Sequence, residues 1–363
     1  MKWSLYLGKY WGIKVFIHWT FLILIGWIAI SGANQGQNVN DILLTLLFVL
    51  TLFFCVTLHE FGHALAAKRF NYKTRDITLL PIGGLARLES MPANPKQELI
   101  VALAGPAVNL VISGLLLTIL ELTNGIPSGS ALAPVSGANF FFLLMVVNFL
   151  LAIFNLIPAF PMDGGRVLRA LLTFNMPRER ATRIATSIGQ LLAIVFVFWG
   201  LFFNPFLIVI GIFVYLGAQA EMVFTQSNSI LHGHTVGDII MHDFHSLHVD
   251  DTISRAVEKL LDSDAKDFAV MDGADMVGTL NRSEIIKAVA QHDVETTVGK
   301  IMNTELKTIT PDTPLEKIYN EQQNTTNSLM PVVQNSRIIG VLDLENVMEF
   351  ILVKKALAKS RGI

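Results

Sequence analysis

Long uncharged stretches constrain this chain more than any other feature. The run from Ile42 to His59 contains no charged residue, and several other runs among the first 226 residues are similarly apolar. A helix needs about 20 such residues to cross the hydrocarbon core of a bilayer. Hydrophobic residues make up 52% of the 363 residues and charged residues only 15%. This composition predicts a polytopic α-helical membrane protein rather than a soluble one.

The apolar runs predict six membrane spans within a domain at 1–226. Their expected ranges are 13–32, 42–68, 97–122, 138–158, 185–203 and 205–224. The first run lacks a small-residue cleavage site, which indicates a retained span rather than a signal peptide. Beyond Leu231 charged residues become common, so we expect a soluble domain at 232–355.

The distribution of Lys and Arg predicts the orientation in the membrane. These residues are frequent in the N-terminal segment, after the second span and after the fourth span, whereas the loops 32–41 and 123–139 contain neither. Cytoplasmic loops carry the excess of positive charge. We therefore expect a multi-pass protein of the cell membrane with both termini and the soluble domain in the cytoplasm.

An apolar stretch after the second span is too short to cross the membrane as a helix. The stretch ITLLPIGGLARLESMP is broken by Pro81, Gly83 and Gly84. Non-helical backbone at membrane depth is tolerated only against protein or a water-filled cavity. The stretch therefore predicts a re-entrant hairpin, with a surface loop between spans as the alternative.

The motif His59-Glu60-Phe61-Gly62-His63 lies at the end of a long apolar run. Two histidines four residues apart lie on one face of a helix, where they can share a zinc ion, and the Glu between them can act as general base. If the histidines only made hydrogen bonds within the bundle, Glu60 would be a costly unpaired charge at membrane depth. The motif predicts a zinc site near the cytoplasmic end of the second span.

Asp163 is the candidate third ligand, because catalytic zinc commonly has three protein ligands and leaves one position for water. It lies in NLIPAFPMDGGR, at the cytoplasmic end of the fourth span and thus at the depth expected for the histidines. Proline breaks the helix before it, and the glycines after it allow a sharp turn. The alternative is that Asp163 caps a helix beginning at Gly165.

Three side chains in the apolar stretches have both a functional and a structural interpretation. Asn109 and Asn155 are suited either to stabilising an oxyanion or to an interhelical hydrogen bond. Cys55 precedes His59 by one turn, and a thiolate binds zinc, but a lone thiol in an apolar helix is typical of packing.

Taken together, HEFGHALAA, LLPIGGLARLE, AGPAVNL, NLIPAFPMDGGRVLRALL and the basic start followed by IKVFIHWTF resemble the site-2 protease family of intramembrane zinc metalloproteases. The resemblance covers the whole membrane domain. It implies one Zn²⁺ ion bound by His59, His63 and Asp163, with Glu60 catalytic and with Asn155 and Asn109 positioning the substrate backbone.

The same resemblance implies a kind of substrate. It is a single-span membrane protein, an anti-sigma factor or a membrane-tethered transcription factor, cut within its transmembrane segment during regulated intramembrane proteolysis. The loop at 123–139 is too short for the PDZ module that some members carry. The net charge of −2 does not indicate direct contact with nucleic acid.

The soluble tail contains an internal repeat, at about 235–291 and 297–353. TVGDIIMHDFHSLHVDDTISRAVEKL aligns with TVGKIMNTELKTITPDTPLEKIYNEQ, and Gly278 aligns with Gly340. Each copy reads as strand, helix, two short strands and helix, and such units bury their apolar faces against each other. The α/β repeat resembles a tandem CBS pair.

The CBS resemblance implies a cleft that often binds an adenine nucleotide. The residues usually found after the last strand are a hydroxyl residue and, three positions later, an Asp. This chain has Asn281 and Glu284 in the first repeat and Asp343 and Asn346 in the second, which departs from that pattern. Nucleotide sensing and a purely structural role, with formation of a homodimer, both remain open.

Two other functions compete with the protease. One is a transporter or channel regulated by its CBS pair, and the other is a pseudoprotease that binds membrane helices without cutting them. Glu60 next to two histidines, together with the Asp163 motif, favours the protease, because neither alternative needs a general base at a zinc site.

Overall fold

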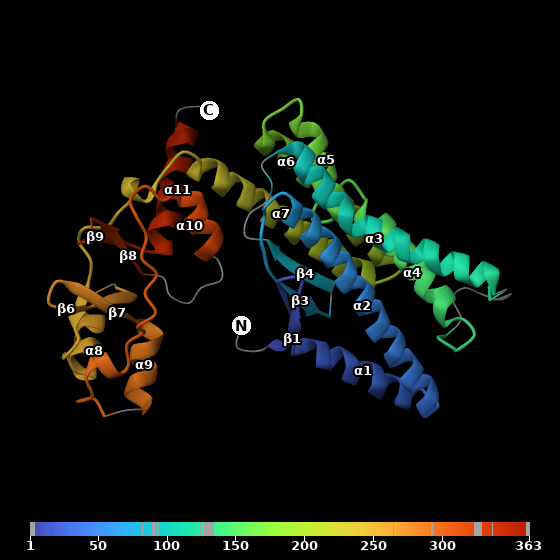
Figure 1. The fold of residues 1–363 in the computed structure, drawn as a ribbon, viewed down its shortest axis with the longest axis horizontal. Helices are drawn as coiled ribbons and strands as arrows, with labels where there is room; N and C mark the ends of the chain where they lie inside the picture. Colours follow the sequence, from blue (N-terminus) through green and yellow to red (C-terminus); the bar gives the residue numbers. More distant parts are fainter. Residues whose placement is uncertain are drawn as a thin grey trace. The chain divides into compact units, whose positions relative to one another are not determined.

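The computed structural model divides the chain into two compact units, Met1–Thr225 and Gln226–Ile363. It describes residues 4–81, 83–88, 92, 94–123, 125–126, 134–263, 265–291, 293–322, 329–335 and 337–360. Figure 1 shows that each unit has its own secondary structure. Each also has its own clusters of buried hydrophobic residues.

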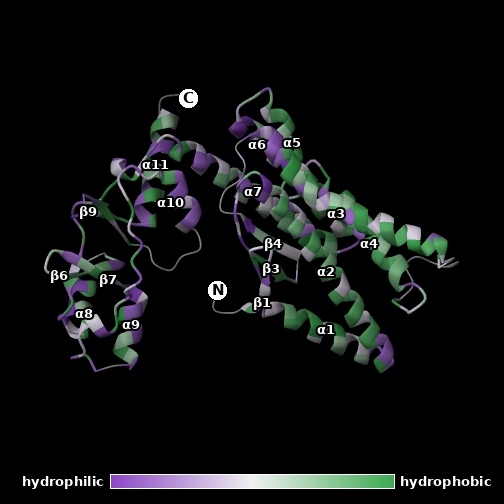
Figure 2. Cartoon of the chain, viewed as in Figure 1, coloured by the Kyte–Doolittle hydropathy of each residue, from purple (hydrophilic) through white to green (hydrophobic). Residues whose placement is uncertain are grey.

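Seven helices are described in or leaving the first unit. They are α1 (Thr20–Asn34), α2 (Val39–Arg69), α3 (Pro95–Leu122), α4 (Phe140–Asn155), α5 (Asp163–Thr173), α6 (Arg178–Phe202) and α7 (Phe206–Leu231). Four of them, α2, α3, α6 and α7, are long and apolar enough to cross a membrane. Figure 2 shows hydrophobic residues along most of α2, α3 and α4. The first unit is therefore a helical membrane domain.

The prediction of six spanning helices is confirmed only in part. Helices α1 and α4 have 15 and 16 residues. At 1.5 Å per residue they are about 22–24 Å long, which is less than the ~30 Å hydrocarbon core. The first predicted span is shorter because its beginning is strand β2 (Ile13–His18), where Ile13 and Val15 are buried in the alternation of a strand.

A four-stranded sheet packs against α2. It contains β1 (Ser4–Tyr10), β2, β3 (Thr74–Leu80) and β4 (Gly83–Leu88), in the order β1-β2-β3-β4. Strands β2 and β3 pair in parallel, and the other neighbours pair antiparallel. A buried cluster joins the sheet to α2 at the level of the HEFGH motif. Its members are Ile13, Val15, Phe61, Ala64 and Ile77.

The expected hairpin after the second span is present as β3 and β4. Leu80 pairs with Gly83 next to the turn. Positions 82 and 89–91 of the predicted stretch lie outside the described residues, as do 124 and 127–133 of the loop judged too short for a PDZ module. The depth of the hairpin in the membrane stays a prediction.

The second unit has the predicted two-fold α/β repeat. The first copy contains β5 (Ser246–His248), α8 (Ile253–Asp262), β6 (Asp267–Asp272), β7 (Asp275–Asn281) and α9 (Arg282–Gln291). The second contains α10 (Leu315–Gln322), β8 (Met330–Gln334), β9 (Arg337–Leu342) and α11 (Leu344–Ser360).

Each copy is completed by backbone from the other. Met241, before the first sheet, bridges to Val341 in β9, and Asn303, before the second sheet, bridges to Thr279 in β7. Gly340 packs directly under Met241 O, so a side chain at that position would overlap the crossing segment. The exchange of segments explains why the two repeats form one unit.

Candidate metal centre

Three potential metal ligands converge inside the membrane unit. Nε2 of His59 and Nε2 of His63 lie 3.1 Å apart, and they lie 3.2 Å and 3.1 Å from Oδ2 of Asp163. All three side chains are buried. The two histidines come from α2, and Asp163 is the first residue of α5.

The spacing of these atoms fits a tetrahedral zinc ion. Two ligand atoms that are each about 2.1 Å from zinc, at a tetrahedral angle, are about 3.4 Å apart. The observed separations of 3.1–3.2 Å are close to that value. Two imidazoles and one carboxylate also form a donor set of the catalytic type, which leaves a fourth position for water.

The second nitrogen of each imidazole has a protein acceptor. His59 Nδ1 lies 2.5 Å from Asn109 Oδ1, and His63 Nδ1 lies 2.8 Å from the backbone oxygen of Val101. If each Nδ1 donates its proton to these acceptors, each Nε2 keeps its lone pair free for a metal. The surroundings therefore favour the tautomer that binds zinc in both histidines.

A glycine allows α3 to approach the histidines. A Cβ atom built on Gly105 would overlap Nε2 of His63 and would lie only 2.7 Å from Nε2 of His59. On α2, a Cβ on Gly62 would lie 2.7 Å from Ala104 O. Sequence reasoning used AGPAVNL only as part of a resemblance and missed this steric role of Gly105.

Asp163 reaches the histidines from a tight turn between α4 and α5. Gly164 packs against the carbonyl groups of Leu156 and Ile157, where no side chain fits. The helix begins at Asp163, and the N-cap residue Met162 makes no side-chain cap. The carboxylate of Asp163 thus faces the histidines, in contrast to the alternative in which it caps a helix starting at Gly165.

Glu60 lies against the backbone of β4. A Cβ atom built on Gly84 would lie 2.6 Å from Cγ of Glu60 and 2.9 Å from its Oε1. Glu60 is half-buried, and it follows His59 directly on α2. The glycine-rich strand therefore places a bare stretch of backbone beside the candidate general base.

The remaining candidates lie in different surroundings. Asn109 contacts His59, as described, whereas Nδ2 of Asn155 donates to Leu151 O within α4. The substrate-positioning roles of both stay predictions. Cys55 is buried in an apolar cluster with Phe48 and Leu144, as expected of a packing residue.

Sequence reasoning missed a second polar cluster, which we name the charge cluster: Glu98, Arg169, Arg178 and Glu221. Nε of Arg169 donates to Glu98 Oε1 at 2.7 Å, and its NH1 donates to Glu221 Oε1 at 2.5 Å. Arg178 NH1 lies 3.0 Å from Glu98 Oε2. Both arginines belong to the basic segment after the fourth span, which the sequence predicts to be cytoplasmic. The signal available was a Glu at the edge of an apolar run: Glu98 directly before the run that begins at Leu99, and Glu221 directly after the run that ends at Ala220.

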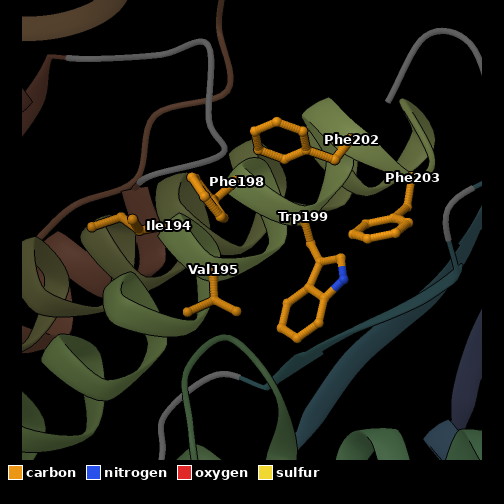
Figure 3. A pocket seen from close by; sticks show the side chains of 6 residues that line it. All are labelled: Ile194, Val195, Phe198, Trp199, Phe202 and Phe203. Carbon is orange, nitrogen blue, oxygen red and sulfur yellow. The ribbon is translucent and has the colours of Figure 1, made fainter.

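Figure 3 shows a pocket whose lining differs from both polar clusters. Its lining is entirely apolar: Ile194, Val195, Phe198, Trp199, Phe202 and Phe203. Phe198 and Trp199 are 62% and 55% exposed. Such a surface suits contact with lipid acyl chains, and it contains none of the candidate ligands.

Comparison with known families agrees with the geometry. The model of peptidase family M50 matches residues 47–134 and 124–198, which include both histidines and Asp163. The model of the CBS domain matches residues 236–291 and 298–353.

Individual relatives extend the similarity over nearly the whole chain. The chain is 31% identical to a zinc metalloprotease of Methanocaldococcus jannaschii, covering 96% of both chains. It is 26% identical to the protein Rip3 of Mycobacterium tuberculosis, covering 97% of this chain and 93% of Rip3. A solved structure of a site-2 protease from Methanocaldococcus jannaschii shares 35% identity, covers 61% of this chain and 95% of that one, and has a TM-score of 0.46.

The buried His-His-Asp cluster, the match to both family models and the full-length relative lead to one conclusion: the chain is a membrane zinc metalloprotease that belongs to peptidase family M50, the site-2 protease family, and it carries two C-terminal CBS domains.

Proposed function

We propose that this protease cuts a transmembrane segment of a single-span signalling protein, an anti-sigma factor or a membrane-tethered transcription factor. The protease domain is 1–226, the CBS domain is 232–355, and both termini are cytoplasmic. The observation that carries the proposal is the meeting of His59, His63 and Asp163 next to Glu60, inside a unit with spanning helices.

In this proposal His59, His63 and Asp163 hold one Zn²⁺ ion. Zinc, when bound, lowers the pKa of its water to about 7 and polarises a carbonyl group. The carboxylate of Glu60 accepts the proton of the attacking water and later delivers it to the leaving amine. The half-buried position of Glu60 supports this role, because water can reach its carboxylate while α2 stays folded.

The position of β4 supports an extended conformation of the bound substrate. Strand β4 ends the sheet order β1-β2-β3-β4, and its Gly84 backbone contacts Glu60. An edge strand can pair with an extended peptide through main-chain hydrogen bonds. We propose that the unwound substrate segment lies along β4, which brings its backbone to the metal centre.

The test compares wild type with Glu60→Gln. Membrane proteomes of cells producing either form are compared for single-span proteins that accumulate uncut, and the zinc content of both purified proteins is measured. We expect uncut substrate with the variant and equal zinc content, because Gln cannot accept the proton and Glu60 is not a ligand. Continued cleavage by Glu60→Gln would contradict the proposed mechanism.

We further propose that an adenine nucleotide regulates the protease through the CBS pair. The match of both repeats to the CBS family supports a nucleotide cleft. Asn281 Oδ1 accepts from the backbone of Glu284, and Asp343 Oδ1 accepts from the backbone of Asn346, so both side chains cap helices. Binding therefore requires other contacts or a change in these caps.

A thermal-shift series on the full-length protein with AMP, ADP and ATP tests the nucleotide proposal. A rise in the unfolding midpoint with adenine nucleotides, and none with GMP, is expected. If none of them shifts the midpoint, nucleotide sensing is wrong. Molecular mass in detergent then tests the structural alternative, a homodimer held by the CBS pair.

A further inference from the structure

We propose that Asn148 is a positioning residue of the metal centre, acting on His59 through Asn109. The inference rests on the proposed role of His59 as a zinc ligand. Asn148 lies in the middle of α4, in none of the motifs that carry the family resemblance. Three helices take part in the contact: α4 through Asn148, α3 through Asn109 and α2 through His59.

The side chains form a continuous buried chain of hydrogen bonds. Asn148 Nδ2 lies 2.8 Å from the backbone oxygen of Leu144. Asn148 Oδ1 lies 3.0 Å from Asn109 Nδ2, and Asn109 Oδ1 lies 2.5 Å from His59 Nδ1. Asn148 is 0% exposed and Asn109 is 1% exposed, so the chain is enclosed by protein.

The direction of every bond in this chain follows from its first member. A backbone carbonyl only accepts, so the NH₂ end of Asn148 must face Leu144 O. The oxygen of Asn148 then faces Asn109, which must present its own NH₂ group there. Asn109 Oδ1 is left to face His59, and because an oxygen of an amide only accepts, His59 must carry its proton on Nδ1.

The position of this proton determines whether His59 can bind a metal. With the proton on Nδ1, Nε2 of His59 has its lone pair free and faces Asp163 and His63. The carbonyl of Leu144 thereby determines the tautomer of a ligand on another helix through two amide side chains. Partners that hold the second nitrogen of a ligating histidine commonly contribute about 10–100-fold to metal affinity.

The two histidines differ in which group holds the proton on Nδ1. His63 donates directly to the backbone oxygen of Val101, which no substitution of a side chain removes. His59 depends on two side chains, so a substitution at Asn148 can affect it. Without the acceptor at Asn148, the amide of Asn109 is free to rotate, and its NH₂ group then favours the tautomer of His59 that is protonated on Nε2.

The experiment measures zinc affinity of the full-length detergent-solubilised protein by competition with a chromophoric chelator. We expect Asn148→Leu, which keeps the branching of the side chain and removes its hydrogen bonds to Leu144 O and Asn109, to weaken zinc binding by about 10–100-fold. Ser113→Ala is the matched control. Ser113 Oγ donates to Met145 O at 3.0 Å, so it also joins α3 to α4 but contacts no ligand. Its zinc affinity should equal that of wild type.

A rescue separates positioning from packing. In the Asn109→Asp variant both carboxylate oxygens are acceptors, so His59 keeps its proton on Nδ1 whether or not Asn148 is present. The double variant Asn109→Asp with Asn148→Leu should therefore bind zinc more tightly than Asn148→Leu alone. A purely structural role of Asn148 predicts no such recovery, and its absence overturns the proposal. If Asn148→Leu does not fold, Asn148→Ala removes the same acceptor with less bulk.

His59→Ala distinguishes failure of this inference from failure of the proposed function. If His59→Ala binds zinc as wild type does, the ligand assignment itself is wrong. If His59→Ala loses zinc while Asn148→Leu binds it with wild-type affinity, the metal centre stands and only the role of Asn148 is refuted.

Discussion

The metal centre and the charge cluster are two buried polar groups in the same membrane unit, and they differ in how their charges are balanced. In the charge cluster, Glu98 and Glu221 face Arg169 and Arg178, so the cluster is neutral by itself. In the metal centre, two imidazole nitrogens and a carboxylate oxygen face one another, and all three are acceptors toward a cation. One cluster is complete without a ligand, and the other is arranged for a metal ion.

Helix α5 contributes to both clusters, with Asp163 at its first residue and Arg169 less than two turns later. The Arg169 guanidinium also lies 4.8 Å from the centroid of the Phe160 ring, in the turn before Asp163. The charge cluster thus anchors the element that supplies the third ligand. Charged side chains within this domain therefore fall into two groups, those that stabilise its packing and those that serve the reaction.

The largest effect expected is on activity, from Asp163→Ala. Removal of one of three ligands should empty the metal site and reduce cleavage on the order of 10³-fold or more. The fold should persist, because Arg166, which lies 3.9 Å from Asp163, is partly exposed and can be solvated after the substitution. Zinc content by mass spectrometry and cleavage of a co-expressed substrate are the measurements. Unchanged zinc would remove Asp163 from the ligand set.

A substitution in the charge cluster should lower stability and leave zinc binding intact. Arg169→Met removes the shared partner of buried Glu98 and half-buried Glu221, and such a loss costs about 3–5 kcal/mol of unfolding free energy. Unfolding by SDS titration measures it, and the folded fraction should still bind zinc. Arg183→Met is the control. Arg183 pairs with Glu179 at an exposed site, where a pair contributes less than about 1 kcal/mol. Equal effects of the two substitutions would refute a stabilising role for the cluster.

A smaller loss of unfolding free energy is expected from Arg178→Met. This variant tests the partly exposed side of the charge cluster, whereas Arg169→Met tests its buried centre. The Arg178 side chain is 30% exposed, and Glu98 keeps Arg169 as a partner after the substitution. We expect a loss of roughly 1 kcal/mol in the same SDS titration. A loss as large as that of Arg169→Met would show that Glu98 depends equally on both arginines.

The smallest effect is expected in the CBS unit, from an acid that belongs to neither cluster. Burial raises the pKa of Asp343 above its ordinary value of 3.8, and nearby Asp267 and Glu345 raise it further. The folded state then holds this proton more tightly than the unfolded state does, so stability falls as the pH rises from about 3.8 through the raised pKa.

Asp343→Asn tests that assignment. Asn also accepts the backbone proton of Asn346 that Asp343 Oδ1 now accepts, so the cap is kept while the charge is removed. A slightly higher thermal midpoint than wild type is expected at pH 7, with the difference shrinking toward pH 4. A lower midpoint at pH 7 would mean that the charge of Asp343 stabilises the unit.

Much of the metal centre could be predicted from the sequence. The four-residue spacing of His59 and His63 on an apolar helix is a local property, and the position of Asp163 at the same depth follows from counting spans. The identity of the acceptor for each Nδ1 atom could not be predicted, because it depends on which face of α3 meets α2. For Asn109 the sequence left an interhelical hydrogen bond open beside substrate positioning, and the structure shows such a bond to His59. The substrate-positioning role stays a prediction.

The fold was predictable to a similar degree. Apolar runs predict the four long helices, together with two that the structure shows to be shorter. Proline and glycine positions predict the hairpin after the second span, and self-similarity predicts the repeat in the tail. The strand Ile13–His18 was read as the start of a helix, because a short apolar run has the same composition in both. Its pairing with β3, far along the chain, decides in favour of the strand.

By itself the sequence determined that the chain enters a membrane, that two histidines share a helix face and that the tail repeats. These properties depend on residues close together in the chain. Only the tertiary structure decided that Gly105 lets α3 approach the ligands, that Arg169 lies between two glutamates and that Asn148 reaches His59 through Asn109. Such contacts join helices that are far apart in sequence, and their geometry is set by how the helices pack rather than by any local pattern.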